Sequence, residues 1–175
     1  MSNPYLPLVN QKMAYIRQLL SFAKADPENL SQRQSNAAIA DAACLELAVA
    51  YRCFLRELAS HYRVANPQAI DSALVALQGV EALSVASPEV QECNSLEQLQ
   101  GGSESWLADT LHYAAQALNP VPTADDVKSQ AAVQLISAVD LSKGGQESLT
   151  AAAVKGWFIA FCELVERHRE GLQEF

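Results

Sequence analysis

The chain has 175 residues, half of them apolar, and a formal net charge of −8. A chain of this length fits one domain with a sizeable core, and its apolar content argues against intrinsic disorder. The acidic balance makes binding to nucleic acid unexpected, because such binding needs a basic surface that neutralises phosphates.

The first third of the chain predicts two helices, over residues 8–25 and 32–63. In the first, Tyr15, Leu19 and Phe22 recur at intervals of three and four residues and form the predicted buried stripe, which Ile16 and Leu20 widen. The second helix is long and carries an apolar seam with the same intervals. Leu45, Val49 and Phe54 add a second apolar side, which predicts a central position in the fold. The seam consists of Ala40, Cys44, Leu47, Tyr51, Leu55, Leu58 and Tyr62.

The middle of the chain predicts three shorter helices. They cover residues 67–83, 89–99 and 103–118. Proline follows a polar capping residue at the start of the first two, where its missing N–H would have no partner in any case. A Gly-Gly pair separates the second from the third, since glycine adopts the left-handed conformation that ends helices. In the first of these helices we expect Ile70, Leu74 and Leu77 to point inward.

Two more helices are predicted toward the C-terminus, over residues 123–138 and 147–170. The last is apolar on nearly every side, so it is expected to be central as well. No segment alternates apolar and polar residues as a half-buried strand does. We therefore expect an all-α fold, a single helical domain over residues 1–175 built as a bundle of six or seven helices around two long central ones. Its core should bring together Leu47, Tyr51, Leu55, Trp157, Phe161 and Leu164.

The acidity of the chain is concentrated in one segment. Between residues 64 and 127 there is no Lys or Arg, while nine Asp and Glu residues fall there. This pattern fits either a solvated acidic face that keeps the protein soluble or a docking surface for a basic protein partner. The binding residues expected for such a docking surface are Glu89, Glu92, Glu97 and a partly exposed Trp106.

A second hypothesis rests on Arg56 and His61. An Arg followed five residues later by a His on one helix resembles the arrangement in a class of helical-bundle nucleases. There His would act as acid and base, and Arg would stabilise the charge that develops on the phosphate. The pattern is short, and the acidic balance counts against it. No metal-binding or nucleotide-binding motif occurs in the sequence, so we expect no metal and no cofactor.

The four cysteines form no C-x-x-C pair and mostly lie in apolar stretches. They are Cys44, Cys53, Cys93 and Cys162. This usage is typical of buried free thiols in a cytoplasmic protein. The N-terminus shows no secretory signal, and no apolar run is long enough to span a bilayer. We therefore expect a cytoplasmic protein without membrane contact.

Four stretches, spread over most of the chain, resemble those of an uncharacterised family of small all-helical proteins found mainly in gammaproteobacteria. They are Asn10-Gln11-Lys12, the segment from Ala43-Cys44-Leu45 to Tyr62-Arg63, Ser105-Trp106-Leu107, and His168-Arg169-Glu170. The resemblance implies a helical, cytoplasmic bacterial protein. It brings no activity, ligand or catalytic residue with it.

The sequence thus favours a non-enzymatic interaction or scaffold protein that presents its acidic surface to a protein partner. The alternatives are a nuclease-like hydrolytic bundle that uses Arg56 and His61, and a bundle that binds a small ligand in a cavity. The sequence does not determine the oligomeric state, so a homodimer is one of the assemblies that it allows.

Overall fold

In the computed structural model, which describes residues 3–102, 104–119 and 149–173, every regular element is a helix. The predicted all-α class is thereby confirmed. The elements are α1 (Leu6–Ser21), α2 (Leu30–His61), the 3₁₀ turn η1 (Pro67–Ala69), α3 (Ala73–Glu81), α4 (Pro88–Gln98), α5 (Trp106–Leu118) and α7 (Ala151–Gln173). The helix predicted over 123–138 lies outside the described residues. None of the described helices is long and apolar enough to cross a membrane.

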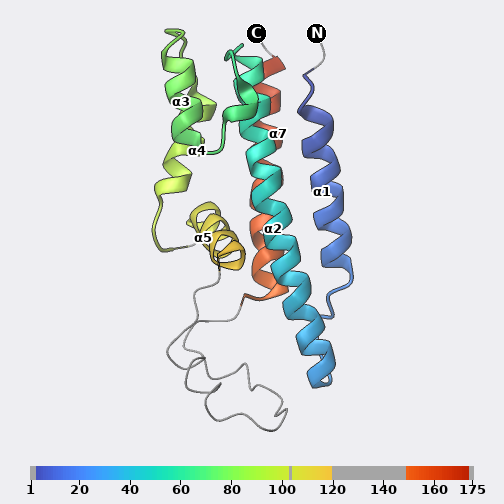
Figure 1. Cartoon of the computed structure of the whole chain (residues 1–175). Coiled ribbons are helices and arrows are strands. Elements are labelled where there is room, and N and C mark those ends of the chain that lie inside the picture. Colours follow the sequence, from blue (N-terminus) through green and yellow to red (C-terminus); the bar gives the residue numbers. More distant parts are fainter. Residues whose placement is uncertain (1–2, 103, 120–148, 174–175) are drawn as a thin grey trace.

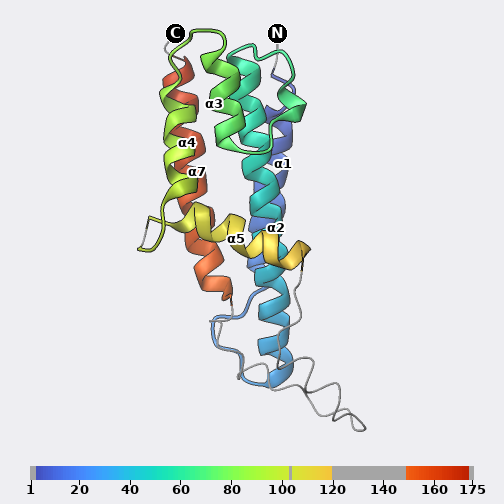
Figure 2. The same cartoon turned by 60° about the vertical axis from the view of Figure 1, so that its left-hand side comes forward.

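The helices form a bundle centred on α2 (Figure 1). α1 and α2 are antiparallel neighbours, and α7 runs alongside α2 in the same direction as α2. α3 and α4 cover another side of α2, and α5 crosses over α2 and α7 (Figure 2). Because α2 contacts every other described element, its predicted central position is confirmed. The turn between α1 and α2 (residues 22–29, the α1–α2 turn) and the start of α7 lie toward the same end of the bundle.

The length of α2, 32 residues, rests on its cap and its apolar seam. Asn29 accepts a hydrogen bond from the Gln32 N–H (2.9 Å), and the Gln32 side chain accepts one from the Glu28 N–H (2.8 Å). Two amides at the start of the helix are thereby satisfied. Six of the seven seam residues are buried, and Tyr62 is half-buried. The predicted seam is confirmed.

The buried face of α1 differs from the predicted stripe. Val9 and Ile16 are fully buried, whereas Tyr15 is 46% and Phe22 is 65% exposed. Ile16 was part of the predicted stripe, and the prediction was wrong for Tyr15 and Phe22. The reason is that α1 is apolar on two sides, and intervals of three and four residues can be traced along either side. The exposed Tyr15 ring lies beneath the Lys12 ammonium group, 5.6 Å from its nitrogen.

The third predicted helix is divided in two. Residues 70–72 separate η1 from α3 and are not helical. Two hydrogen bonds from other helices hold this break. Arg56 Nε donates to the Ile70 carbonyl (3.0 Å), and the Ala73 N–H donates to the Glu97 carboxylate (2.8 Å).

The break changes which face of α3 is buried. Ile70 is buried, as predicted, but Leu74 is 50% exposed and Leu77 is half-buried. The inward position predicted for Leu74 was wrong, because contacts from α2 and α4 set the start of α3 independently of its spacing. The buried face of α3 consists of Ala73, Ala76 and Val80.

The core joins α2 to α7, as predicted, except that one of the predicted core residues is replaced by its neighbour. The predicted core residues Leu47, Tyr51, Leu55, Phe161 and Leu164 are buried in one cluster. Trp157 is only half-buried, and its neighbour Phe158 is buried instead. Spacing alone does not choose between these neighbours on a helix that is apolar nearly all round. Trp157 packs against Tyr113 of α5, with ring centroids 5.8 Å apart.

Candidate functional site

The nuclease-like pair does not converge in the structure. Arg56 is half-buried, and its Nε donates to the Ile70 carbonyl, so its guanidinium holds the segment between η1 and α3. His61 is exposed at the C-terminal end of α2, with its ring edge-on to Tyr62. Five residues along a helix rotate the side-chain direction by about 140°. Arg56 and His61 therefore face different surroundings.

Two of the α4 acids expected at the docking surface bind tyrosines of α2. The Tyr62 hydroxyl donates to the Glu89 carboxylate. The Tyr51 hydroxyl donates to Glu97 (2.9 Å), and the same carboxylate oxygen accepts the Ala73 N–H. Burial, together with neighbouring acidic groups, raises the pKa of both tyrosines. The hydroxyls therefore stay protonated as donors, and both acids are engaged inside the bundle.

The third of these acids, Glu92, contacts α7. The exposed Arg167 guanidinium donates to it. The His168 ring lies beside it, with Nε2 3.3 Å from the carboxylate but without hydrogen-bond geometry. His168 is buried and stacks on Phe54, with ring centroids 6.0 Å apart. Burial lowers the pKa of His168 and Glu92 opposes that shift, so the ring is neutral at pH 7.

Trp106 is buried rather than partly exposed, with 8% of its surface accessible. The prediction placed it at the solvent because it opens a helix beside a Gly-Gly pair. In the structure α5 crosses over the bundle and packs against α2, α4 and α7, so its first turn is covered. This turn is held by a hydrogen bond from the Ser105 hydroxyl to Asp109 (2.8 Å).

A polar cluster that sequence reasoning missed lies between α1, α2 and α7. Arg169 binds the buried Glu57 carboxylate through two hydrogen bonds of 2.8 Å each, from Nε and one Nη. Its other Nη donates to Asn10 (2.8 Å), and Asn3 donates to the Glu57 carbonyl (2.8 Å). Bidentate geometry and complete partnering make this cluster a structural clamp. Asn10 and Arg169 belong to two of the stretches that carry the family resemblance, and this contact gives them a structural role.

The surroundings of the four cysteines do not favour catalysis or metal binding. Three are buried and Cys162 is half-buried, and all four are free thiols. Burial raises the pKa of each, to about 11 for Cys44, whereas a reactive thiol needs a lowered pKa. Among the residues that the structure describes, no group of three or more His, Cys, Asp and Glu is placed to hold a metal ion.

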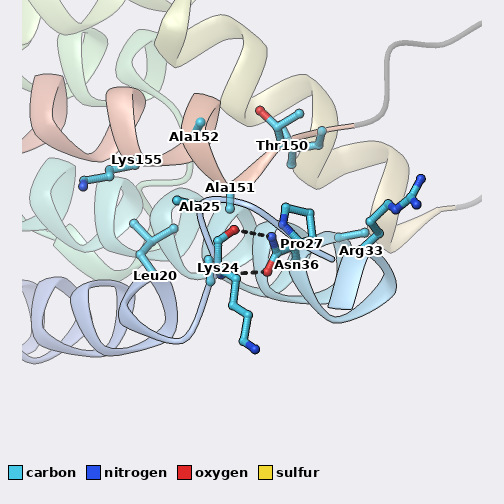
Figure 3. A pocket seen from close by; sticks show the side chains of 13 residues that line it. Leu20, Lys24, Ala25, Pro27, Arg33, Asn36, Thr150, Ala151, Ala152 and Lys155 are labelled. Carbon is cyan, nitrogen blue, oxygen red and sulfur yellow. Dashed lines mark hydrogen bonds between the residues drawn. The ribbon is translucent and has the colours of Figure 1, made fainter. Parts of the chain in front are cut away.

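A cavity of about 540 Å³ lies between the α1–α2 turn and the start of α7 (Figure 3). Its volume is in the range of small-molecule sites, about 300–1,000 Å³. The half-buried part of the lining is largely apolar and comes from α1, the turn, α2 and α7. Its apolar residues are Leu20, Ala23, Pro27, Ala37, Leu149 and Ala151.

Three basic side chains surround the mouth of this cavity, and we call them the mouth cations. They are Lys24 of the α1–α2 turn, Arg33 in the first turn of α2 and Lys155 in the second turn of α7, and all three are exposed. Figure 3 shows them on different sides of the cavity, pointing outward from its apolar lining. The described lining contains no Asp or Glu, and within the described ranges no carboxylate pairs with a mouth cation. The charged side chains of the described lining are therefore all basic, on a chain of net charge −8, while Asp26 and Glu28 stand on either side of the lining residue Pro27.

Hydrogen bonds fix the two walls of the cavity. Asn36 Nδ2 donates to the Lys24 carbonyl (2.7 Å) and Asn36 Oδ1 accepts the Lys24 N–H (3.0 Å), which ties the α1–α2 turn to α2 (Figure 3). On the other wall, Thr150 Oγ1 accepts the Ala153 N–H (3.1 Å) and so caps α7. Residues 151–152 also line the cavity and stand at a helix start, where N–H groups have no intrahelical acceptor.

Comparison with known proteins places the chain in a family without assigning an activity. No significant similarity to a curated protein or to a solved structure was found. A family model described as a family of unknown function (DUF6586) matches residues 7–175. This range includes the four stretches that carry the resemblance seen in the sequence, and every described residue of the cavity lining. Because the match spans nearly the whole chain, the protein belongs to this family of unknown function.

Proposed function

We propose that this protein is a non-enzymatic helical bundle that binds a small molecule in the cavity between the α1–α2 turn and the start of α7. The observation that carries the proposal is the cavity itself, with a volume of about 540 Å³, a half-buried apolar lining and polar groups at its mouth. Small-molecule sites combine these features, because apolar walls supply contact area and a few polar groups fix the orientation of the ligand.

The lining favours binding over catalysis. Its described residues include no His, Cys, Asp or Glu, which are the groups that most often transfer protons or attack substrates in enzymes. The Thr150 hydroxyl is engaged as the cap of α7. Arg56 and His61 line no part of the cavity, so this site lends no support to the hydrolytic alternative.

If the cavity binds small molecules, it should take up Nile red, an uncharged dye that fluoresces in apolar surroundings. Two adjacent residues of α2 provide a matched pair of variants, because Ala37 lines the cavity and the exposed Ala38 does not. Ala37→Trp should fill the site and weaken dye binding at least about tenfold, a loss of about 1.4 kcal/mol. Ala38→Trp adds the same side chain outside the site and should leave binding unchanged. Identical fluorescence titrations for the two variants would contradict the proposal.

The interaction role is a second candidate and concerns a different surface. Leu74 and Val75 of α3, and Leu83 and Val85 after it, are between 38% and 50% exposed. The segment from residue 64 to residue 127 contains no Lys or Arg. A partner helix with apolar and basic side chains would complement this surface, whereas a second copy of the chain would bring acids against acids.

Capture of a partner from a lysate of the native host, followed by cross-linking, tests this second candidate. A partner that uses the α3 surface should be lost with Leu74→Lys. It should be retained with Val49→Lys, because Val49 is an exposed apolar residue of α2, on a different helix from the α3 surface. If both variants capture the same proteins as the wild type, the α3 surface has no part in binding.

A further inference from the structure

We infer that the ligand of the cavity is an amphipathic anion, a small molecule that carries a carboxylate or phosphate group on an apolar body; the inference rests on the proposed function. The charged side chains of the described lining are opposite in sign to the net charge of the chain. The whole chain has 20 acidic and 12 basic residues, yet the described lining holds three basic residues and no acidic one. An anion is therefore attracted to this site, while the net negative charge of the molecule opposes its binding elsewhere.

The position of the charges within the cavity defines the shape of the ligand. The mouth cations are exposed, whereas apolar lining residues such as Leu20 and Ala151 are half-buried. In Figure 3 the mouth cations lie around the apolar lining rather than at one point. Exposed Lys and Arg side chains change rotamer within picoseconds to nanoseconds, so each can turn toward a charged group at the mouth. A ligand with its anionic group at the mouth and its apolar body inside matches both parts of the site.

The side chains of the mouth cations have no role in holding the described part of the fold. Other basic residues do have one: Lys12 pairs with Glu46 (2.9 Å), and Arg169 pairs with Glu57 (2.8 Å). The mouth cations have no carboxylate partner among the described residues. A bound anion would bring a counter-charge to the mouth, and a charge-assisted hydrogen bond from any one of the mouth cations would be stronger than a neutral one.

The start of α7 adds a weaker attraction for the same chemistry. This helix has 23 residues, and the aligned peptide dipoles of a helix leave partial positive charge at its N-terminal end. Ala151 and Ala152 line the cavity there, and Lys155 follows one turn later on the same face. An inorganic anion would also be attracted to this end of the helix, but it would leave the apolar lining without a partner.

Isothermal titration calorimetry, which measures the affinity of the protein for three octyl compounds, tests the inference. The compounds are octanoate, octyl phosphate and the uncharged octanamide, each used below its aggregation threshold. At low salt the two anions should bind at least about tenfold more tightly than octanamide. Their advantage should shrink as sodium chloride is added, because salt screens charges that are exposed to solvent.

Variants of the mouth cations separate the contribution of charge to ligand affinity from that of the apolar lining. Arg33→Gln combined with Lys155→Gln should remove most of the preference for anions and leave the affinity for octanamide unchanged. Arg52→Gln is the matched control, because Arg52 is an exposed arginine of α2 that does not line the cavity. All three positions are exposed, so the variants should keep the wild-type melting temperature in circular dichroism.

The outcomes distinguish this inference from the function on which it rests. If octanamide binds as tightly as octanoate, or if Nile red binds and no octyl compound does, the inference is wrong and the proposed function stands. Binding to vesicles of phosphatidylcholine and phosphatidylglycerol, without binding to monomeric octanoate, would identify a membrane surface and also overturn the inference. If neither Nile red nor any octyl compound binds, the proposed function itself fails.

Discussion

At the residue scale, the pair formed by Glu57 and Arg169 shows how one contact ties three helices together. The two side chains are 6% and 23% exposed, and Arg169 also reaches Asn10 of α1. Removing two such charges from water opposes folding, and the bidentate hydrogen bonds offset that cost. Removing one partner should therefore lower the free energy of unfolding by much more than the intact pair adds to it.

Arg169→Ala is expected to lower the free energy of unfolding by about 3–5 kcal/mol, because it leaves a buried carboxylate without its partner. The neighbouring Arg167→Ala is the control. Arg167 is exposed where it pairs with Glu92. Loss of this ion pair should therefore lower the free energy of unfolding by less than about 1 kcal/mol. Urea denaturation of both variants measures the difference. Equal losses would show that Glu57 does not depend on Arg169.

His168 should make the stability of the fold depend on pH. Burial lowers its pKa below the ordinary value of 6.5, with Arg167 acting in the same direction and Glu92 and Glu89 opposing. In the unfolded chain the ring takes up a proton near pH 6.5. The stability linked to neutral His168 is thus fully present above pH 6.5. It is lost as the pH falls from there through the pKa of the folded state.

This dependence can be measured against His168→Leu. The urea midpoint of the wild type should fall between about pH 7 and pH 5, and that of the variant should fall less over the same range. All other residues are the same in both proteins, so the difference between the two curves isolates His168. Parallel curves would mean that His168 keeps its ordinary pKa in the fold.

At the element scale, α2 could be predicted from the sequence almost completely, whereas the faces of α1 and α3 could not. The seam of α2 runs over most of its length and is buried as predicted, and of the second apolar side Phe54 is buried and Val49 is exposed. α1 is apolar on two sides, so spacing indicated Ile16 together with the exposed Tyr15 and Phe22, and it did not indicate Val9. The start of α3 depends on Arg56 and Glu97, and contacts between distant segments leave no local pattern in the sequence.

Glu97→Ala should loosen α3 as a unit. The Glu97 carboxylate accepts both the Ala73 N–H at the start of α3 and the Tyr51 hydroxyl, so its loss leaves two donors without partners. A buried donor without a partner costs about 1–3 kcal/mol. Amide hydrogen exchange in α3 should accelerate, and it should not do so with Gln98→Ala at the exposed neighbouring position. Unchanged exchange in the Glu97 variant would show that α3 is held by packing alone.

At the scale of the whole molecule, negative charge remains in excess after the internal contacts are made. Glu89 and Glu97 bind neutral tyrosine hydroxyls, so their charges are not cancelled. Salt screens the repulsion that follows from a net charge of −8, over a Debye length of about 8–10 Å at physiological ionic strength. The melting temperature should therefore rise from low to moderate sodium chloride. A falling trend would show that ion pairs such as Glu57–Arg169 outweigh the repulsion.

The cavity could not be predicted from the sequence, although its parts are visible there. Lys24 and Arg33 stand on either side of the turn at Pro27, and Lys155 lies far along the chain in an apolar helix. Only the antiparallel packing of α1 on α2 and the start of α7 bring the three together. Motif searches favour residues that are close in sequence, which is why they pointed to Arg56 and His61 instead.

Titration of the isotope-labelled protein with octanoate, followed through its backbone amide NMR signals, tests the central claim most directly. We expect saturable shift changes confined to residues 20–37 and 149–155, which surround the cavity. The changes should weaken in Arg33→Gln and persist in Arg52→Gln. Shift changes centred on α3, or a spectrum that stays the same up to millimolar octanoate, would contradict an anion-binding cavity at this end of the bundle.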